Sequence, residues 1–449
     1  MSFPRYPEYK DSGVEWLGEV PGHWEVTSLG RITVSRCDGP FGSGLKSEHY
    51  TETGVRVVRL QNIKAKGFND SDAAFIDQEY HDNDLTGHEV VAGDMLIAGL
   101  GDDNNLVGRA CVAPVGIEPA MVKADCFRFR LDQQRASSTF VAAVLSISAE
   151  YDSGMLATGT TRSRIPLTIT SGRRIPLPPL PEQTAIAAFV ARETAKIDAL
   201  VAEQGRLMDL LKEKRQAVIS HAVTKGINPD APTKDTGIEW LGEVPVHWPV
   251  KPLKYLVTLT SGGTPSKENL TYWDGDVPWA SSKDLKPSEL WDTQDHITQK
   301  ALDDGAAVLV PTGSILTVVR GMILLHTFPV VVARVPMAIN QDLKAILPTT
   351  GVNADFLAWL LRGASAEVLS RTDEAAHGTK VLRLESWLAM QVPVPPVTEQ
   401  ADIVAGIIRR LGELDTLTAE AQRAIALLQE RRTALISAAV TGQIDVRLH

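Results

Sequence analysis

Polar side chains that could recognise base edges stand in two glycine-rich loops of this chain. The first loop, 38–46, reads DGPFGSGLK, and the second, 261–267, reads SGGTPSK at the corresponding place in the second half. Backbone amides of such loops contact phosphates, which positions a protein on DNA without specifying a sequence. Each loop also carries one lysine, which can bond to guanine, so these loops are candidates for nucleic-acid recognition.

Pairs of Asn and Gln next to apolar strand-like runs add further candidates. So does a short repeated motif in which Gly-Thr precedes a basic residue. The motif is 159–162 (GTTR) and 378–380 (GTK), each shortly before a proline cluster. Each amide has the alternative of serving a satisfied turn or a core edge. The candidate DNA-contacting residues are Ser43, Lys46, Gln61, Asn62, Thr160, Arg162, Arg164, Thr264, Ser266, Lys267, Lys283, Asn340, Gln341 and Lys380.

Motifs for catalysis are missing from the sequence. It holds no GxxxxGK[ST] phosphate loop, no HExxH metal pair and no Asn/Asp-Pro-Pro-Tyr/Phe tetrapeptide of an amino-methylating enzyme. The segment from Gly99 to Gly101 lacks a third glycine in register and is better explained as a tight turn. We therefore predict no catalytic residue, no metal site and no cofactor in this chain. The alternative is a nuclease or methyltransferase chain with its own active site, such as a nuclease with a hidden acidic metal site. Asp342-Leu343-Lys344 is a faint indication of such a site, but no convincing upstream acid accompanies it.

Composition sets the broad class. A chain of 449 residues is too long for one core, so two or more domains are expected. A net charge of −10 argues against DNA binding unless basic side chains gather on one face of the protein. Such a face is suggested by the arginines at 128, 130, 162, 164, 173 and 174. Three cysteines without a CxxC pair, no apolar leader and no spanning segment predict a cytoplasmic protein that does not enter membranes.

The chain carries the same sixteen-residue frame twice. Segments 11–26 (DSGVEWLGEVPGHWEV) and 235–250 (DTGIEWLGEVPVHWPV) agree at 12 of 16 positions. The repeated tryptophans could stack on bases, but a large indole at such a junction more simply anchors a helix end to a domain. We expect structural packing for His23 and His247 as well. Duplication predicts two equivalent structural units.

Two long helices are the clearest predicted elements. They begin after the proline clusters at Pro179 and Pro396, carry an acid in the first turn (Glu182, Glu399), and align without a gap. An apolar seam at a mean period of 3.5 is typical of a coiled coil, so we expect the helices to pack on each other, antiparallel if the halves are related by a two-fold. The predicted seam residues are Ile186, Val190, Ile197, Leu200, Leu207, Leu211, Ile403, Ile407, Leu414, Leu417, Leu428 and Leu435.

The inserts between these repeats read as globular domains. Both hold short β-rich runs punctuated by Gly, Pro, Asn and Asp, and each ends in a helical stretch. The predicted fold class is therefore mixed α/β (α+β): two globules, a pseudo-two-fold internal repeat, and two long antiparallel helices forming an intramolecular coiled coil. A further alternative is a structural tether with no role in DNA binding. The dissimilar sequences of the two inserts argue against it.

In combination, the frame, the Pro-Pro-x-x-Glu-Gln helix start and Ser-Gly-Gly-Thr-Pro-Ser resemble the specificity subunits of type I restriction-modification systems. The resemblance covers essentially the whole chain. It implies two target-recognition domains, at 27–178 and 251–395, each reading one half of a bipartite asymmetric DNA site. The frame segment 1–26, the central region 179–250 and the C-terminal helix region 396–449 complete the predicted organisation.

The resemblance also implies partners. The helices would set the spacer and dock two modification subunits, which carry S-adenosylmethionine and methylate adenine N6. Restriction subunits, with ATP and Mg²⁺, would join through that complex. This chain itself would be a non-catalytic DNA-recognition subunit.

Overall fold

The computed structural model describes residues 3–41, 44–156, 163–375 and 378–447, the stretch 152–156 by its backbone alone. The chain divides into two compact units, each of which is described by itself. Unit 1 comprises 1–204 and 423–449, and unit 2 comprises 205–422.

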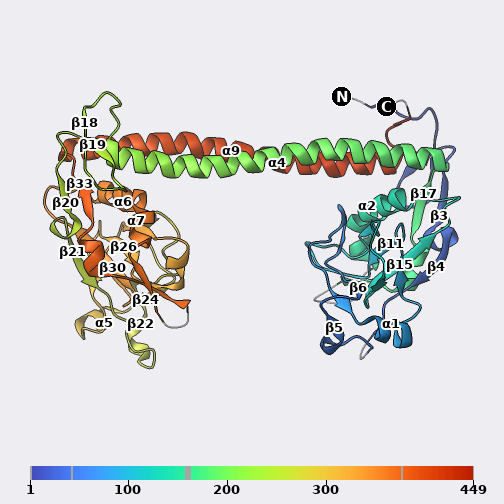
Figure 1. Ribbon diagram of the computed structural model, residues 1–449, viewed down its shortest axis with the longest axis horizontal. Helices are drawn as coiled ribbons and strands as arrows, with labels where there is room; N and C mark the ends of the chain where they lie inside the picture. The colour runs from blue at the N-terminus through green and yellow to red at the C-terminus, as the bar shows by residue number, and fades with distance from the viewer. Residues whose placement is uncertain (1–2, 42–43, 157–162, 376–377, 448–449) are drawn as a thin grey trace. The chain divides into compact units, whose positions relative to one another are not determined.

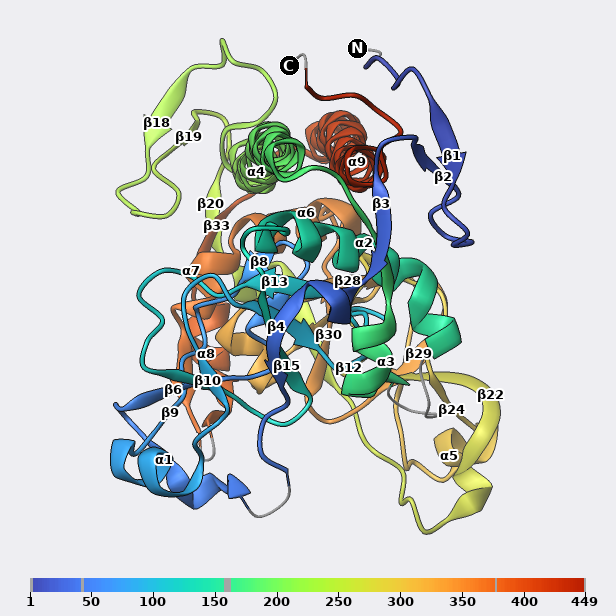
Figure 2. The same ribbon diagram turned by 90° about the vertical axis from the view of Figure 1, so that its right-hand side faces the viewer.

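Two long helices, α4 (Leu180–Lys225) and α9 (Val397–Val440), confirm the predicted pair (Figures 1 and 2). In unit 1, Asp198 of α4 accepts a hydrogen bond from Nε of Arg432 of α9 at 3.0 Å. In unit 2, Arg215 of α4 forms an ion pair with Asp415 of α9. Higher α4 numbers meet lower α9 numbers, so the helices are antiparallel.

Burial along the predicted seam is uneven. Ile186, Ile403 and Ile407 are fully buried, whereas Leu200 and Leu417 are 52% and 48% exposed. Ile197, Leu211 and Leu414 are buried; Leu207 is 41% exposed; Val190, Leu428 and Leu435 are partly buried. Two helices alone share only a narrow contact strip. Most of the buried positions belong to the core clusters of the globules, which supply a third wall.

In unit 1, a four-stranded antiparallel sheet has the order β13-β11-β15-β4. Its strands are β4 (Thr33–Cys37), β11 (Met95–Ala98), β13 (Ala110–Val112) and β15 (Cys126–Leu131). A second sheet, β10-β14-β6-β9-β5, contains a parallel pair, β6 with β14. Its strands are β5 (Tyr50–Thr51), β6 (Val55–Val58), β9 (Phe75–Ile76), β10 (Glu89–Val90) and β14 (Ala120–Val122). Helix α2 (Ser138–Leu156) lies between the long helices and the first sheet (Figure 1).

Unit 2 repeats this plan. Its first sheet has the order β21-β30-β26-β28-β23 and is antiparallel except for the edge pair β23 with β28. Its second sheet, β24-β22-β29-β25, again holds one parallel pair, β22 with β29. The strands are β21 (Val257–Ser261), β22 (Trp273–Ala280), β23 (Glu289–Leu290), β24 (Asp295–Ile297), β25 (Leu309–Val310), β26 (Ile315–Val318), β28 (Val330–Ala333), β29 (Met337–Ile339) and β30 (Leu343–Pro348). Helix α6 (Ala354–Gly363) takes the place of α2 (Figure 1).

Small elements complete each unit. Unit 1 adds β1 (Tyr9–Asp11), β2 (Glu19–Pro21), β3 (Glu25–Ser28), β7 (Ile63–Lys64), β8 (Gly67–Phe68), α1 (Gln78–Asp84), β12 (Leu100–Gly101), β16 (Ser163–Arg164), α3 (Leu167–Gly172) and β17 (Arg174–Leu177). Unit 2 adds β18 (Thr233–Asp235), β19 (Glu243–Pro245), β20 (Val250–Pro252), α5 (Gln299–Asp303), β27 (Arg320–Gly321), α7 (Ser365–Leu369), β31 (Thr372–Glu374), β32 (Lys380–Leu382), α8 (Leu384–Leu388) and β33 (Gln391–Pro393).

The duplicated frame binds the first turn of each long helix. In unit 1, Glu182 accepts hydrogen bonds from the Tyr6 hydroxyl at 2.6 Å and the Trp24 indole at 3.1 Å, and lies 2.8 Å from His23 Nε2. Burial and the Glu182 carboxylate raise the pKa of Tyr6, which therefore stays a hydrogen-bond donor. Trp24 is fully buried, so the expectation that it anchors a helix end is confirmed.

In unit 2, Glu399 makes the contacts to the repeated His and Trp but has no counterpart of the Tyr6 contact among the described residues. It accepts from the Trp248 indole at 3.0 Å and lies 2.9 Å from His247 Nε2. Trp248 is also fully buried, and it packs beside Gly226 at the end of α4. The repeated His-Trp and Glu residues are thus one structural device used twice.

The glutamine after each of these acids ties the helix to its globule. Gln183 donates to the Pro178 carbonyl at 2.8 Å and accepts from the Ser137 amide, just before α2, at 2.8 Å. Gln400 donates to the Pro395 carbonyl at 2.9 Å and accepts from the Asn353 amide, at the start of α6, at 2.7 Å. These contacts account for the Glu-Gln pair in both copies.

Candidate nucleic-acid interface

In each unit, one edge of the second sheet gathers four loops. Parallel strands end at the same edge, so the turns after β6 and β14 lie together, as do those after β22 and β29. Backbone bonds lock each pair of turns: Lys123 N donates to Val58 O at 2.9 Å, and Asn340 N donates to Ala280 O at 2.9 Å. We call the loops at this edge the loop cluster of each unit.

The glycine loops join these clusters by close backbone approach. A Cβ on Gly39 would overlap the carbonyl group of Lys123, and one on Gly262 would overlap that of Ile339. Only glycine lets the chain lie this close to the strand end. The sequence prediction that the two glycine loops correspond agrees with this geometry.

The fourth member of each cluster is a short β-ribbon. In unit 1, β12 pairs with β16, placing Leu100 opposite Arg164. In unit 2, β27 pairs with β32, placing Arg320 opposite Val381. Ile165 N donates to Gly99 O and Leu382 N to Val319 O, both at 2.9 Å, so the ribbons are tied to equivalent positions.

Arg164 is held by two side chains of the unit 1 cluster. Its Nε donates to Asp125 Oδ1 at 2.8 Å, and its guanidinium carbon lies 5.3 Å from the centre of the Phe41 ring. Asp125 has a φ of 61°, a left-handed conformation that Asp tolerates better than most residues. Asp38, at the start of the glycine loop, is partly buried, and burial raises the pKa of its carboxyl to about 6.

The unit 2 cluster carries different side chains. The Thr264 hydroxyl donates to Gln341 Oε1, and Lys344 Nζ donates to Ser261 Oγ. Two indoles support the glycine loop, with Trp279 donating to Gly263 O at 3.0 Å and Trp273 donating to Ser266 O at 3.1 Å. Thr264 and Gln341 are thus brought together, as candidate DNA-contacting residues from distant parts of the sequence.

The amides at 61 and 62 have separate environments. Asn62 is fully buried; its Oδ1 accepts from Arg59 N at 2.8 Å, and its Nδ2 donates to Asn69 O and Asp72 O, both at 2.9 Å. Its hydrogen-bonding groups therefore satisfy the turn, which is the alternative to a DNA contact for this amide. Gln61 is exposed and bonds Asp72.

The other candidates lie at or near the clusters with varied partners. Lys283 pairs with Asp295 at 2.7 Å and Lys380 with Glu374 at 3.1 Å; Asn340 is buried and accepts from Asp342 N at 3.1 Å. Lys46 lies 3.6 Å from Glu48, and Ser266 and Lys267 are exposed. Ser43, Thr160 and Arg162 fall outside the described residues.

Sequence reasoning did not select Phe41, Lys123 or Asp125. Phe41 lies in the glycine loop 38–46, but nothing in the neighbouring sequence indicated that it would contact an arginine. Asp125 adopts a positive φ that its sequence neighbours did not reveal, and its partner Arg164 is 39 residues away. Within the described residues, no group of three or more His, Cys, Asp or Glu could hold a metal ion. Among the described helices, none is long and apolar enough to cross a membrane.

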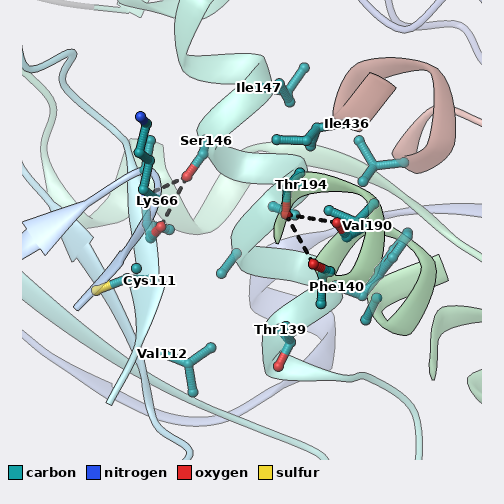
Figure 3. Close-up of a pocket in the computed structure, with 18 of the residues that line it drawn as sticks. Lys66, Cys111, Val112, Thr139, Phe140, Ser146, Ile147, Val190, Thr194 and Ile436 are labelled. Atoms are coloured by element: carbon teal, nitrogen blue, oxygen red, sulfur yellow. Dashed lines mark hydrogen bonds between the residues drawn. The ribbon is translucent and has the colours of Figure 1, made fainter. Parts of the chain in front are cut away.

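Unit 1 also holds a cavity of about 320 Å³ where α2 meets α4 and α9 (Figure 3). Phe140, Ile147, Val190 and Ile436 line it with mostly apolar surface, and Ser146 is engaged with the Ala110 backbone. In unit 2, a Cβ on Gly363 of α6 would overlap Val223 of α4, so the helices there approach closely. Unit 1 thus has an apolar cavity beside its helix pair, and unit 2 has a close approach of α6 and α4.

Comparisons with known proteins agree with the resemblance. Residues 245–426 match the family model of the type I restriction modification DNA specificity domain. The chain is 28% identical over 252 residues to the EcoR124I/EcoR124II specificity subunit of Escherichia coli. That match covers 54% of this chain and 55% of the relative, so the chain matches about half the length of that protein.

Two solved structures share the fold. A chain from a structural study of complex assembly and conformational transition of the type I R-M system has a TM-score of 0.68 at 16% identity, covering 94% of this chain and 98% of that one. The HsdS subunit of Thermoanaerobacter tengcongensis has a TM-score of 0.54 at 16% identity, covering 95% and 98%. The chain is thus similar in sequence and fold to specificity subunits of type I restriction-modification systems, and its residues 245–426 match the DNA specificity domain of that family.

Proposed function

We propose that the chain is the DNA-sequence reader of a type I restriction-modification complex, with each loop cluster reading one half of a bipartite site in double-stranded DNA. One observation carries this proposal: two units build the same loop cluster on the same strand plan but equip it with different polar side chains. Equivalent scaffolds with different side chains suit two different half-sites, because base edges are distinguished by donor and acceptor pattern.

The remaining parts have supporting roles in this proposal. The helices α4 and α9 set the spacer between half-sites and dock two modification subunits, which carry S-adenosylmethionine for adenine N6 methylation. Restriction subunits with ATP and Mg²⁺ join through them, in the cytoplasm. The chain contributes recognition and assembly and no chemistry of its own, and its partners supply much of the phosphate contact, as its net charge of −10 suggests.

Exchanging residues 251–391 for the equivalent domain of another family member tests the proposal. Methylome sequencing of cells with the complete system should show one half of the methylated motif replaced and the other half retained. Exchange of residues 27–178 is the matched control and should change the opposite half. A motif altered in both halves by either exchange would rule out independent reading.

A further inference from the structure

We infer that Arg164 reads a guanine in the half-site recognised by unit 1, and that Asp125 and Phe41 position it for this. The inference rests on the proposed function and assigns a specificity-determining residue to one of its two clusters.

The geometry of Arg164 leaves the two terminal amino groups of its guanidinium, Nη1 and Nη2, available to bind a base; we call this pair the fork. The contact to Asp125 uses Nε, at 2.8 Å, and among the described residues no hydrogen bond engages Nη1 or Nη2. The side chain is 49% exposed, so these two amino groups face solvent in part. Guanine presents O6 and N7 as adjacent acceptors in the major groove, and an arginine fork matches that pair.

Arg164 is also held in place. Its backbone is paired with Leu100 in the ribbon, its Nε is bonded to a carboxylate, and its guanidinium lies over the Phe41 ring. A long side chain loses less entropy on binding when it is already ordered, so the contact gains affinity. Phe41 itself is 53% exposed, which leaves apolar surface beside the fork.

Asp125 is constrained to serve this purpose. Its carbonyl accepts from Gly99 N at 2.8 Å, and the turn closes with Cys126 N donating to Lys123 O at 2.9 Å. The left-handed backbone at Asp125 is unfavourable for most residues, and such strain gathers at functional sites. The carboxylate is thereby fixed beside the ribbon.

Unit 2 lacks this arrangement at the same place. Val381 holds the position of Arg164 opposite β27, and Asp342 holds that of Asp125, with its carbonyl accepting from Val319 N at 2.9 Å. Unit 2 carries its exposed arginine, Arg320, on the other strand of the ribbon, β27, so the two ribbons present an arginine from different strands. The two half-sites should differ at the base this position reaches.

Selection of full-length protein on a pool of random-sequence duplex DNA, followed by sequencing, tests the inference. The wild type should select a bipartite motif with a preferred guanine in one half. Arg164→Lys keeps the charge but loses the fork, so the preference at that guanine should fall by about tenfold to hundredfold while the other positions persist. Asp125→Asn, which tolerates the left-handed backbone, should weaken the same position to a smaller degree.

Two controls separate the possible outcomes. Arg174→Lys, an exposed arginine of unit 1 on β17, should leave the motif unchanged. Gln341→Ala in unit 2 should alter only the other half, which assigns the guanine to unit 1. An unchanged motif in Arg164→Lys, or a uniform loss of affinity in Arg164→Ala with every base preference kept, would overturn the inference. A wild type that selects no motif would instead refute the proposed function.

Discussion

At the scale of single residues, the repeated acids explain why short motifs recur in an otherwise divergent chain. Glu182 is buried and serves three side chains from the frame, whereas Glu399 is more exposed and serves two. A buried donor that loses its acceptor keeps its full desolvation cost. The same motif should therefore contribute more to stability in unit 1 than in unit 2.

Glu182→Ala should lower the free energy of unfolding of unit 1 by about 2–4 kcal/mol, because the Tyr6 hydroxyl and Trp24 indole would stay buried without an acceptor. Glu399→Ala, the matched variant, should cost less. Hydrogen exchange at the first turns of α4 and α9 measures each effect locally. Equal losses in the two variants would contradict this reading.

Asp38 predicts a pH dependence of stability. Its pKa of about 6 lies above the usual value, because burial disfavours the carboxylate. The folded state then binds more protons than the unfolded state, so the stability contributed by Asp38 falls as pH rises from about 4 to 6 and stays constant above. Asp38→Asn removes this titration.

The difference in unfolding free energy between Asp38→Asn and wild type should therefore rise across that interval, in favour of the variant, and level off near pH 7. Urea unfolding of both proteins at matched pH values gives this difference, in which the other titrating groups cancel. A flat difference between pH 4 and 7 would show that the carboxyl is not perturbed.

At the scale of elements, the long helices are set by a heptad pattern that tolerates change only in register. Inserting one heptad after Gln204 and its mate after Ala421 preserves the seam and adds about 10 Å of helix. If the pair determines the spacer, the non-specific gap in the methylated motif should grow by about three base pairs, with both half-sites unchanged.

Methylome sequencing reads the spacer directly. Inserting two residues at each point, which rotates the apolar stripe by about 200° to the opposite face, is the control and should impair assembly. An intact complex with an unaltered gap would show that the helices only hold the units together.

At the scale of the whole molecule, the chain is expected to need partners for chemistry. The purified chain with DNA, Mg²⁺ and S-adenosylmethionine should show neither methyl transfer nor cleavage. Methylation should begin only when modification subunits are added. Asp342→Ala and Lys344→Ala should leave the rate of that methylation unchanged at saturating DNA. Activity that purifies with the chain and disappears in these variants would establish the catalytic alternative.

The sequence by itself determined the two-unit plan, the long helices and their bounds. Duplicated frames are visible without an alignment, and a seam of period 3.5 is local information. The same pattern did not reveal that Leu200, Leu207 and Leu417 would be exposed. Full burial of a seam residue requires that a globule also packs on the helix pair.

Only the tertiary structure decided which polar residues share a cluster. The two globules show little sequence likeness because a strand plan needs only apolar residues at the right period, so their common topology emerged from pairing. Asn62 proved to be committed to its own turn, while Thr264 meets Gln341 across 77 residues and Arg164 meets Asp125 across 39. Such contacts are made by chain segments that adjoin only after the strands pair, and no local pattern encodes them.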